Sequence, residues 1–249
     1  ASDVYKRQIK HANPCGVAIG TNLMEAYQKA VQCDQTSAFG GIVALNVELT
    51  GEVATKILEI FTEVIIAPYV TEEAKKVLME KKNLRVLETG GLPNPRMMEN
   101  SIKRIAGGFL LQDGDTGKVE EENLQIVTER HPNDRELKDL LIAYRIAKHV
   151  KSNAIITVKD NTTVGIGAGQ VSRIEAVDIA ISKSKAAIKG SILCSDAFFP
   201  FRDSIDKISQ YNINGVIQPG GSIKDNEVIE ACNEHNIPMV FTGRRCFKH

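Results

Sequence analysis

The feature that most constrains the fold is a regular alternation of short apolar runs with helical patterns along the 249-residue chain. The apolar runs predict strands at Gly41–Asn46, Glu63–Ala67, Leu84–Leu87, Arg104–Leu111, Ala154–Val158, Ser191–Ser195, Gly215–Gln218 and Pro238–Thr242. Apolar residues three and four positions apart predict helices at Leu23–Val31, Glu52–Phe61, Glu72–Glu80, Asp134–Val150, Ser172–Ser184 and Asn226–His235. This alternation is typical of an α/β protein whose helices pack on a sheet.

Two parts of the chain also resemble each other. In the first part, a strand that leads into Pro68 is followed by an acidic helix and by a strand that leads into Thr89-Gly90. In the second part, the same elements run from Pro219 to Thr242-Gly243. Such a repeat predicts a duplicated α/β subdomain. We expect residues 9–120 to form the first copy, incomplete at its start, and residues 121–249 the second, with a ligand cleft between them.

Composition and charge exclude several classes of protein. The 31 Lys and Arg residues balance the 31 Asp and Glu residues, so we expect no broad electrostatic footprint for nucleic acid or an anionic membrane. The five cysteines are scattered singly without a C-x-x-C pair, which favours reduced thiols in the cytoplasm over zinc or redox motifs. The sequence contains no apolar run long enough to predict a membrane span. Any anionic ligand must therefore be held by local clusters of basic side chains.

The first eight residues form a polar stretch directly in front of an expected core strand. The stretch ASDVYKRQ begins without Met, and DVYKRQ is also the translation of a common sequencing-library transposon end. We therefore expect residues 1–8 to be a non-native leader and the natural chain to extend further upstream.

Lys10 and His11 open the first group of residues that could carry chemistry. In a strand, two adjacent side chains point to opposite faces, but Pro14 and Gly16 favour a tight turn that would bring both heads into one small volume. An imidazole can take a proton at neutral pH, and an ammonium can stabilise developing negative charge or protonate a leaving nitrogen. The alternative is a surface lysine beside a packed histidine.

A glycine-rich segment, residues 165–170, precedes an expected helix that opens with Ser172, Arg173 and Ile174. Glycines before a helix N-terminus admit a ligand close to backbone N–H groups, which is a common anion site. The third glycine comes one residue too early for a dinucleotide fingerprint, and residues 183–185 lack the acidic residue that such a site needs. We therefore expect no nicotinamide cofactor. The open alternatives are a tight turn required by packing and an anion or carboxamide contact made by Arg173.

Three phenylalanines lie close together in residues 195–203. Because Pro200 splits them, they cannot all point into one core, so some of them are expected to line a pocket for a flat ring. Asp196 or Asp203 would offer acceptors to ring nitrogens. The alternative is a hydrophobic plug capped by Asp203.

The C-terminal tail and a short motif after the longest helix complete the candidates. Arg245 follows the last core strand without a linker, so its guanidinium could reach back to a phosphate in bidentate geometry. A basic tail is ordinarily solvated and frayed. Asn153 could orient a carbonyl group, and the ordinary explanation for it is a helix cap.

These motifs occur together in one order. They are Lys-His-x-Asn-Pro-x-Gly, Asp-x-x-Ser-Ala-Phe-Gly-Gly, Lys-Ser-Asn-Ala, Gly-Ile-Gly-Ala-Gly-Gln-x-Ser-Arg, Ser-Asp-Ala-Phe-Phe-Pro-Phe-Arg-Asp and Gln-Pro-Gly-Gly-Ser. From Ile9 to His249 the sequence resembles the C-terminal transformylase domain of the bacterial AICAR transformylase/IMP cyclohydrolase family. Upstream, that family carries a cyclohydrolase domain and the start of the transformylase domain, with an Arg-Tyr-Gly motif of the nucleotide site. We expect both to be missing from this truncated chain.

The resemblance implies a fold, an assembly and a reaction. The implied fold is a three-layer αβα arrangement of two cytidine-deaminase-like subdomains, in a homodimer with active sites at the subunit interface. The implied reaction is transfer of a formyl group from 10-formyltetrahydrofolate to the 5-amino group of AICAR (5-aminoimidazole-4-carboxamide ribonucleotide) in purine biosynthesis. The resemblance implies no zinc, and a monovalent cation near the C-terminus is a further candidate cofactor.

The resemblance also assigns roles to individual residues. The family's catalytic positions fall on Lys10, His11 and Asn153, of which Asn153 would orient the formyl group. Its AICAR-binding positions fall on Asp34, Ser172, Arg173, Phe198 and Arg245, and its folate-binding positions on Ile174, Phe198, Phe201 and Asp203.

The chemistry of the reaction agrees with these roles. The amine of AICAR is conjugated with its ring, so it is a poor nucleophile and must lose a proton as it attacks. His11 suits that task as a general base, and Lys10 would stabilise the tetrahedral oxyanion or protonate the departing folate nitrogen. Two other interpretations stay open: an AICAR-binding module without turnover, and a zinc-dependent hydrolytic deaminase of a related fold.

Overall fold

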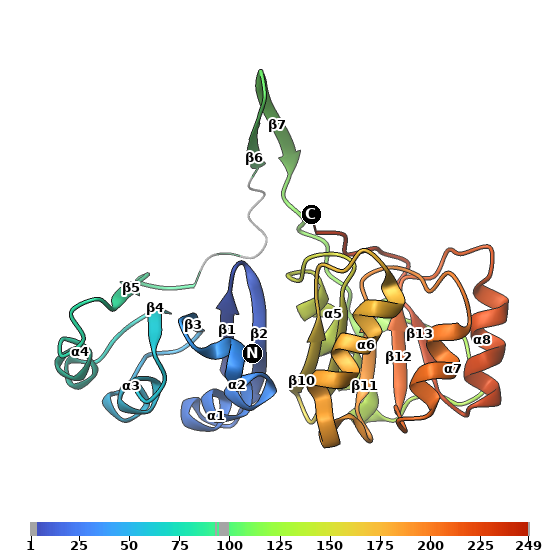
Figure 1. Ribbon diagram of the computed structural model, residues 1–249, viewed down its shortest axis with the longest axis horizontal. Helices are drawn as coiled ribbons and strands as arrows, with labels where there is room; N and C mark the ends of the chain where they lie inside the picture. The colour runs from blue at the N-terminus through green and yellow to red at the C-terminus, as the bar shows by residue number, and fades with distance from the viewer. Residues whose placement is uncertain (1–3, 93, 95–99, 249) are drawn as a thin grey trace.

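The computed structural model describes residues 4–92, 94 and 100–248 (Figure 1). The strands are β1 (Val4–Lys10), β2 (Asn13–Gly20), β3 (Gly41–Leu45), β4 (Thr62–Ala67), β5 (Arg85–Glu88), β6 (Asn100–Ile105), β7 (Gly108–Asp113), β8 (Gln125–Ile126), β9 (Ile155–Lys159), β10 (Thr162–Gly167), β11 (Ile192–Ser195), β12 (Gly215–Gln218) and β13 (Met239–Phe241). The helices are α1 (Leu23–Cys33), α2 (Gln35–Ala38), α3 (Gly51–Ile57), α4 (Glu72–Leu78), α5 (Asp134–Ala147), α6 (Arg173–Ser184), α7 (Asp203–Ser209) and α8 (Asp225–Glu234), with 3₁₀ turns η1 (Glu121–Asn123) and η2 (Lys185–Ile188).

The described strands other than β6 and β7 form one mixed sheet in the order β5-β4-β3-β1-β2-β10-β9-β11-β12-β13-β8. In the first half, β1 pairs antiparallel with β2 and β3, and β3, β4 and β5 run parallel. In the second half, β9 pairs antiparallel with β10 and β11, and β11, β12 and β13 run parallel. Apart from β8, which pairs antiparallel with β13 and has no counterpart in the first half, the two halves share one strand order and one pairing pattern. They meet where β2 pairs with β10. The assignment of each half to the cytidine-deaminase-like fold and the boundary at residue 120 stay predictions.

Helices cover both faces of the second half of the sheet. On one face, α5 packs on apolar residues of β9, β11 and β12, such as Ile156, Ile192 and Ile217. On the other face, α6, α7 and α8 pack on the alternate residues Ile155, Leu193 and Val216. This arrangement confirms the expected three-layer α/β fold.

The first half of the sheet is covered differently. Helices α1, α3 and α4 pack on the buried residues Val43, Leu45 and Ile65 of β3 and β4. The alternate residues of these strands face the other way and stay partly exposed; they are Ile42, Ala44, Val64 and Ile66. The first half therefore presents an open apolar face in this single chain.

A hairpin made of β6 and β7 stands away from the body of the molecule (Figure 1). The apolar run Arg104–Leu111 predicted a single strand there, and that prediction is wrong. Ala106 and Gly107 reverse the chain between the two strands, and Gly107 takes a positive φ of 83° that glycine tolerates without steric cost. The apolar pattern predicts extended strand on both sides of this two-residue turn, but it does not reveal the turn between them.

The glycine-rich segment also differs from its prediction, because Gly165 and Gly167 lie in β10 rather than in a loop. A Cβ atom on Gly167 would lie 2.0 Å from the carbonyl oxygen of Ala176 in α6. In the first half, a Cβ atom on Gly16 in β2 would lie 1.9 Å from the carbonyl oxygen of Ala30 in α1. Strands β2 and β10 thus each carry a glycine where the backbone of a helix packs directly against the strand. Because glycine is typical of turns, the apolar pattern did not predict these two strands.

Residues 4–8 belong to β1, which pairs with both β2 and β3. Residues 1–3 lie outside the described residues, and the origin of residues 1–8 as a foreign leader stays a prediction. None of the helices in the described part of the chain has the length and apolar character that a membrane span requires.

Candidate active site

The turn between β1 and β2 presents the Lys10–His11 pair. His11 and Ala12 form a two-residue turn in which both φ angles are positive, 50° and 64°, as in the type I′ hairpin. The expectation of a turn at Pro14 and Gly16 is wrong, since both lie within β2. A left-handed conformation costs a residue other than glycine roughly 1–2 kcal/mol. Such strain at His11 is an observation that points towards function.

The same turn is tied to the segment that carries Asn153. The Asn13 side chain accepts a hydrogen bond from the backbone N–H of Lys151 at 2.9 Å. The Lys10 ammonium donates to the carbonyl oxygen of Phe39 at 2.8 Å, and the His11 side chain is exposed at the tip of the turn. Asn13 therefore links the Lys10–His11 turn of the first half to residues 151–153 of the second.

Both ends of the Asn153 carboxamide are held. Its Nδ2 donates to the carbonyl oxygens of Gln170 at 2.9 Å and Val171 at 3.0 Å, and its Oδ1 accepts from Arg173 Nη2 at 2.7 Å. Helix α5 ends at Ala147, so Asn153 is not the cap of that helix. With both amide hydrogens engaged, a bond from Asn153 to a formyl oxygen requires one of them to be released.

Arg173 is buried against an acidic partner. Its Nη1 atom lies 2.5 Å from Asp196 Oδ1 and donates to Ser195 Oγ at 2.8 Å. The side chain of Arg173 is 9% exposed and that of Asp196 is 0% exposed. The other oxygen of Asp196 accepts from the Ser152 hydroxyl at 2.5 Å. Asp196 thus serves side chains of the protein, which corrects the expectation that it offers an acceptor to a ligand ring.

In the loop before α6, backbone N–H groups donate hydrogen bonds to other parts of the protein. The N–H of Gly169 donates to the carbonyl oxygen of Lys151 at 2.7 Å, and the N–H of Gln170 donates to that of Asn153 at 3.4 Å. Ser172 caps α6, because its hydroxyl accepts from the N–H of Glu175. These contacts and the strand glycines favour the packing explanation of the segment over an anion cradle.

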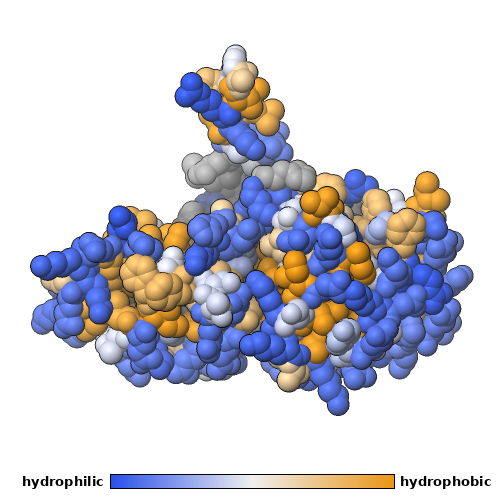
Figure 2. All heavy atoms as spheres, viewed as in Figure 1, coloured by the Kyte–Doolittle hydropathy of each residue, from blue (hydrophilic) through white to orange (hydrophobic). Residues whose placement is uncertain are grey.

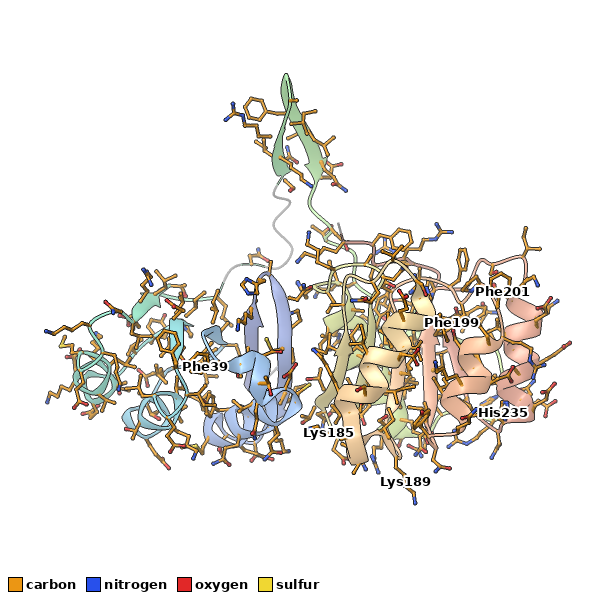
Figure 3. The ribbon with its side chains drawn as sticks, in the orientation of Figure 1. Phe39, Lys185, Lys189, Phe199, Phe201 and His235 are labelled. Atoms are coloured by element: carbon orange, nitrogen blue, oxygen red, sulfur yellow. The ribbon has the colours of Figure 1, made fainter. Side chains whose placement is uncertain are left out.

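The phenylalanines of residues 195–203 separate as expected. Phe199 is fully buried in the core, whereas Phe201 is 52% exposed (both labelled in Figure 3). The Arg245 guanidinium lies 5.1 Å from the ring centre of Phe198, and the Lys224 ammonium lies 5.1 Å from that of Phe201. Two aromatic faces with cationic neighbours therefore point out of the core.

The remaining folate-site candidates, Ile174 and Asp203, lie at the starts of α6 and α7. Ile174 is partly buried in the first turn of α6. Asp203 is exposed at the start of α7, where its carboxylate accepts from the N–H of Ser204 at 2.6 Å. Their contacts with a folate stay predictions.

The C-terminal tail is docked rather than frayed. The N–H of Cys246 donates to the carbonyl oxygen of Asp196 at 2.9 Å, and the N–H of Ser152 donates to that of Lys248 at 2.9 Å. The Tyr144 hydroxyl donates to the carbonyl oxygen of Arg244 at 2.7 Å. The backbone on both sides of Arg245 is thus fixed to the segment around Ser152 and Asp196.

Asp34 has partners of its own. Its carboxylate caps α2 through the N–H and hydroxyl of Ser37 at 2.9 and 2.7 Å, and it lies 2.9 Å from the Lys183 ammonium of α6. Burial alone would raise the pKa of this carboxyl, but Lys183 and the Ser37 bonds outweigh burial and lower it. Asp34 is therefore an ion-pair partner between the halves, and its contact with AICAR stays a prediction.

Cys15 is next to the Lys10–His11 turn in the sequence, but its thiol is a poor nucleophile. It is buried, and burial followed by the nearby Asp34 carboxylate raises its pKa. Burial also raises the pKa of Cys33 and of Cys232 to about 12. Among the described residues, no group of three His, Cys, Asp or Glu side chains is arranged to hold a metal ion.

The sequence motifs contained Asp196, Ser152 and Asn13, but their spacing did not reveal what they do. Asp196 joins Arg173 to Ser152, and Asn13 joins the two halves. These contacts link residues that are 44 and 138 positions apart. The sequence had already made Asp196 a candidate, though for another role, and membership in the quoted motifs is the signal that could have drawn attention to Ser152 and Asn13.

The fold and these contacts define a three-layer α/β protein in which an arginine–aspartate pair holds a carboxamide beside docked aromatic and basic side chains. The family model described as the AICARFT/IMPCHase bienzyme matches residues 3–183, and the chain belongs to this family. The chain is 51% identical to the bifunctional purine biosynthesis protein PurH of Rhizobium etli (strain CIAT 652), 52% identical to that of Paracoccus denitrificans (strain Pd 1222) and 53% identical to that of Chelativorans sp. (strain BNC1).

Each of these matches covers 97% of this chain and 47% of the relative. The chain therefore spans about half the length of the curated relatives that it matches. Among solved structures, reduced HcgD from Methanocaldococcus jannaschii aligns over 94% of this chain and 79% of that chain with 11% identity and a TM-score of 0.20. That similarity is too low to support an argument about the fold.

Proposed function

We propose that this chain carries the AICAR formyltransferase activity of its family, with 10-formyltetrahydrofolate as the formyl donor. The observation that carries the proposal is the bond from Lys151 N–H to Asn13, which ties the Lys10–His11 turn to the segment of Asn153. The Arg173–Asp196 pair then fixes Asn153, and the docked tail places Arg245 over Phe198. The proposal also rests on the family membership and on the identity of 51–53% to the PurH relatives.

In the proposed reaction, the amine of AICAR attacks the formyl carbon of the folate. His11 takes a proton from that amine as the new carbon–nitrogen bond forms, because the conjugated amine is a weak nucleophile. Lys10 stabilises the tetrahedral oxyanion, or donates a proton to the folate nitrogen as its bond to the formyl carbon breaks. Holding the two substrates in line supplies much of the remaining rate enhancement. Asn153 contacts the reacting groups, and Phe198 and Phe201 line the space for the flat rings.

The activity is tested by mixing AICAR and 10-formyltetrahydrofolate with this chain and with a chimera that adds the upstream half of the Rhizobium etli relative. Release of tetrahydrofolate is followed by absorbance, and AICAR binding by calorimetry. We expect the chimera to turn over. Binding without turnover in both forms would support the AICAR-binding module instead, and loss of both binding and turnover would contradict either function.

Replacing Arg245 with alanine should weaken AICAR binding by about tenfold or more, because a bond between a guanidinium and a phosphate contributes roughly 1.5–3 kcal/mol. We expect kcat to change much less than the dissociation constant measured by calorimetry. Arg244→Ala is the matched control, since the Arg244 guanidinium lies against Gly117 instead. Equal affinities of the Arg245→Ala variant and the wild type would contradict the proposed phosphate contact.

We also propose that the protein forms a homodimer whose active sites lie at the subunit interface, as the resemblance implies. Two exposed apolar surfaces of the single chain support this. One is the open face of β3 and β4 described above. The other is the hairpin face that carries Ile102, Phe109 and Leu111, which are 67%, 72% and 62% exposed. Figure 2 shows apolar side chains at the surface of this hairpin. An isolated two-stranded hairpin is marginally stable in water, so a second copy would cover this face.

The dimer is tested by sedimentation of the wild type and a Phe109→Lys variant at micromolar concentration. We expect the wild type to sediment as a dimer and Phe109→Lys to shift towards the monomer, because a lysine next to Leu111 in the apolar face, opposite Arg104, would have to lose its hydration. Ser101→Lys is the matched control, since Ser101 lies on the opposite face of the same hairpin. A monomeric wild type would contradict the proposal, as would equal dissociation of the two variants.

The remaining assignments belong to the same proposal. A soluble folate and an AICAR nucleotide as co-substrates fit a cytoplasmic protein, and the buried free thiols fit a reducing compartment. The monovalent cation near the C-terminus stays a prediction that activity assays in sodium and potassium buffers would test.

A further inference from the structure

Asp196 contacts two of the residues around the proposed site, Arg173 and Ser152. It follows β11 directly and is fully buried. One carboxylate oxygen lies 2.5 Å from Arg173 Nη1, and the other accepts from the Ser152 hydroxyl at 2.5 Å. A buried carboxylate is stable only when it is paired and hydrogen-bonded. The ion pair and hydrogen bond that stabilise the Asp196 carboxylate therefore also hold the side chains of Arg173 and Ser152 in place.

The arginine passes this constraint to Asn153. A guanidinium only donates hydrogen bonds, so Arg173 Nη2 at 2.7 Å fixes the oxygen end of the Asn153 carboxamide. The carbonyl oxygens of Gln170 and Val171 fix its nitrogen end. Ser195 Oγ accepts from the same Nη1 atom that binds Asp196. The carboxamide of Asn153 therefore cannot rotate by 180° without breaking hydrogen bonds at both of its ends.

We propose that Asp196 is a positioning residue for formyl transfer, which acts through Arg173 to fix the oxygen end of the Asn153 carboxamide, so that the carboxamide keeps its place when one of its N–H groups is released to the formyl oxygen. This inference rests on the proposed formyltransferase function. It assigns Asp196 no contact with either substrate, because both of its oxygens are occupied by Arg173 and Ser152. The charge of Asp196, and not only its size, is what holds the buried guanidinium in place.

Asp196→Asn keeps the size of the side chain and removes its charge. The Arg173 guanidinium then lacks its buried counterion, moves away from its place and releases Asn153. In the chimera described above, we expect kcat to fall about 10²-fold, as for a small misplacement of a reacting group. The KM for AICAR should rise by a smaller factor than kcat falls, since the resemblance also places Arg173 in the AICAR site. Asp196→Glu keeps the charge and should recover part of the lost kcat.

A double-mutant cycle separates positioning from a general structural effect. If Asp196 acts through Asn153, then Asp196→Asn should lower kcat much less in an Asn153→Ala background than in the wild type. If Asp196→Asn fails to fold, the pair Asp196→Asn with Arg173→Gln removes both buried charges together. The kcat of that pair should equal the kcat of Arg173→Gln alone.

Asp139→Asn is the matched control. Asp139 is also a buried aspartate, and its carboxylate accepts from the N–H groups of Asp160 and Asn161 at the β9–β10 turn. We expect it to lower the melting temperature without lowering kcat. The positioning role is overturned if Asp139→Asn and Asp196→Asn lower kcat equally, or if the losses from Asp196→Asn and Asn153→Ala multiply. An inactive wild-type chimera would instead overturn the proposed function, and this inference with it.

Discussion

Replacing His11 with alanine is expected to lower kcat for formyl transfer by about 10²–10⁴-fold, the usual contribution of a general base, while AICAR affinity stays close to that of the wild type. The imidazole lies exposed at the tip of the β1–β2 turn, where it can approach a bound substrate. Its replacement removes no buried contact, so the variant should fold normally. Steady-state rates, AICAR calorimetry and a melting curve would be measured on the chimera.

His131→Ala is the control for this prediction, because His131 is an exposed histidine before α5 and no site contact is proposed for it. Added imidazole should restore part of the rate of His11→Ala and leave His131→Ala unchanged. A His11→Ala variant with a normal rate would show that another group takes the proton from the amine. A loss of AICAR affinity equal to the loss in kcat would show that His11 binds substrate rather than acting as a base.

The turn that carries His11 shows how the site and the fold depend on each other. Two residues other than glycine adopt positive φ angles there, at a cost that the pairing of β1 with β2 and β3 must offset. The pairing also determines which backbone positions can meet residues 151–153, through Asn13. The duplicated strand order matters for the same reason, since β2 and β10 are the neighbours that join the two halves.

Local sequence patterns predicted much of the fold but little of the site geometry. The helices around α1, α5, α6 and α8 and the parallel strands came from periodicity, which depends only on neighbouring residues. Apolar periodicity gave no bounds for helix α7, because Ile205 and Ile208 are its only large apolar residues. The pairing of Arg173 with Asp196 depends on where β11 and α6 lie in space. No spacing in the sequence contains that information.

The glycines of β10 are a second feature whose role could not be predicted from the sequence, because that role depends on packing. Residues 165–170 have the composition of a phosphate-binding loop, yet Gly165 lies where a Cβ atom would be 2.2 Å from the carbonyl oxygen of Ala180. The composition is therefore explained by the close approach of α6 to β10. A phosphate-binding loop and close packing of a helix on a strand both require glycine. To tell them apart one must know which backbone packs on the strand, and a single sequence does not contain that information.

Gly167→Ala is expected to destabilise the protein by about 3 kcal/mol or more, at the upper end of the cost of overpacking a core. The added Cβ atom would lie 2.0 Å from the carbonyl oxygen of Ala176 and 3.2 Å from its Cα. Both are backbone atoms of α6, so no side-chain rotation can relieve the clash. The helix must move away from β10 and would carry Arg173 with it.

A loss of this size should lower the melting temperature by roughly 6–12 °C for a chain of this length, and it would be measured by calorimetry and by urea unfolding. Gly108→Ala is the matched control, because a Cβ atom on Gly108 meets nothing within 4 Å, and we expect a change within about 0.5 kcal/mol. Because Gly167→Ala displaces the start of α6, it should also lower kcat at temperatures where the protein is still folded. If both glycine variants melt with the wild type, α6 does not lie on β10 as closely as these contacts require, and the position of Arg173 beside Asn153 would have to be reconsidered.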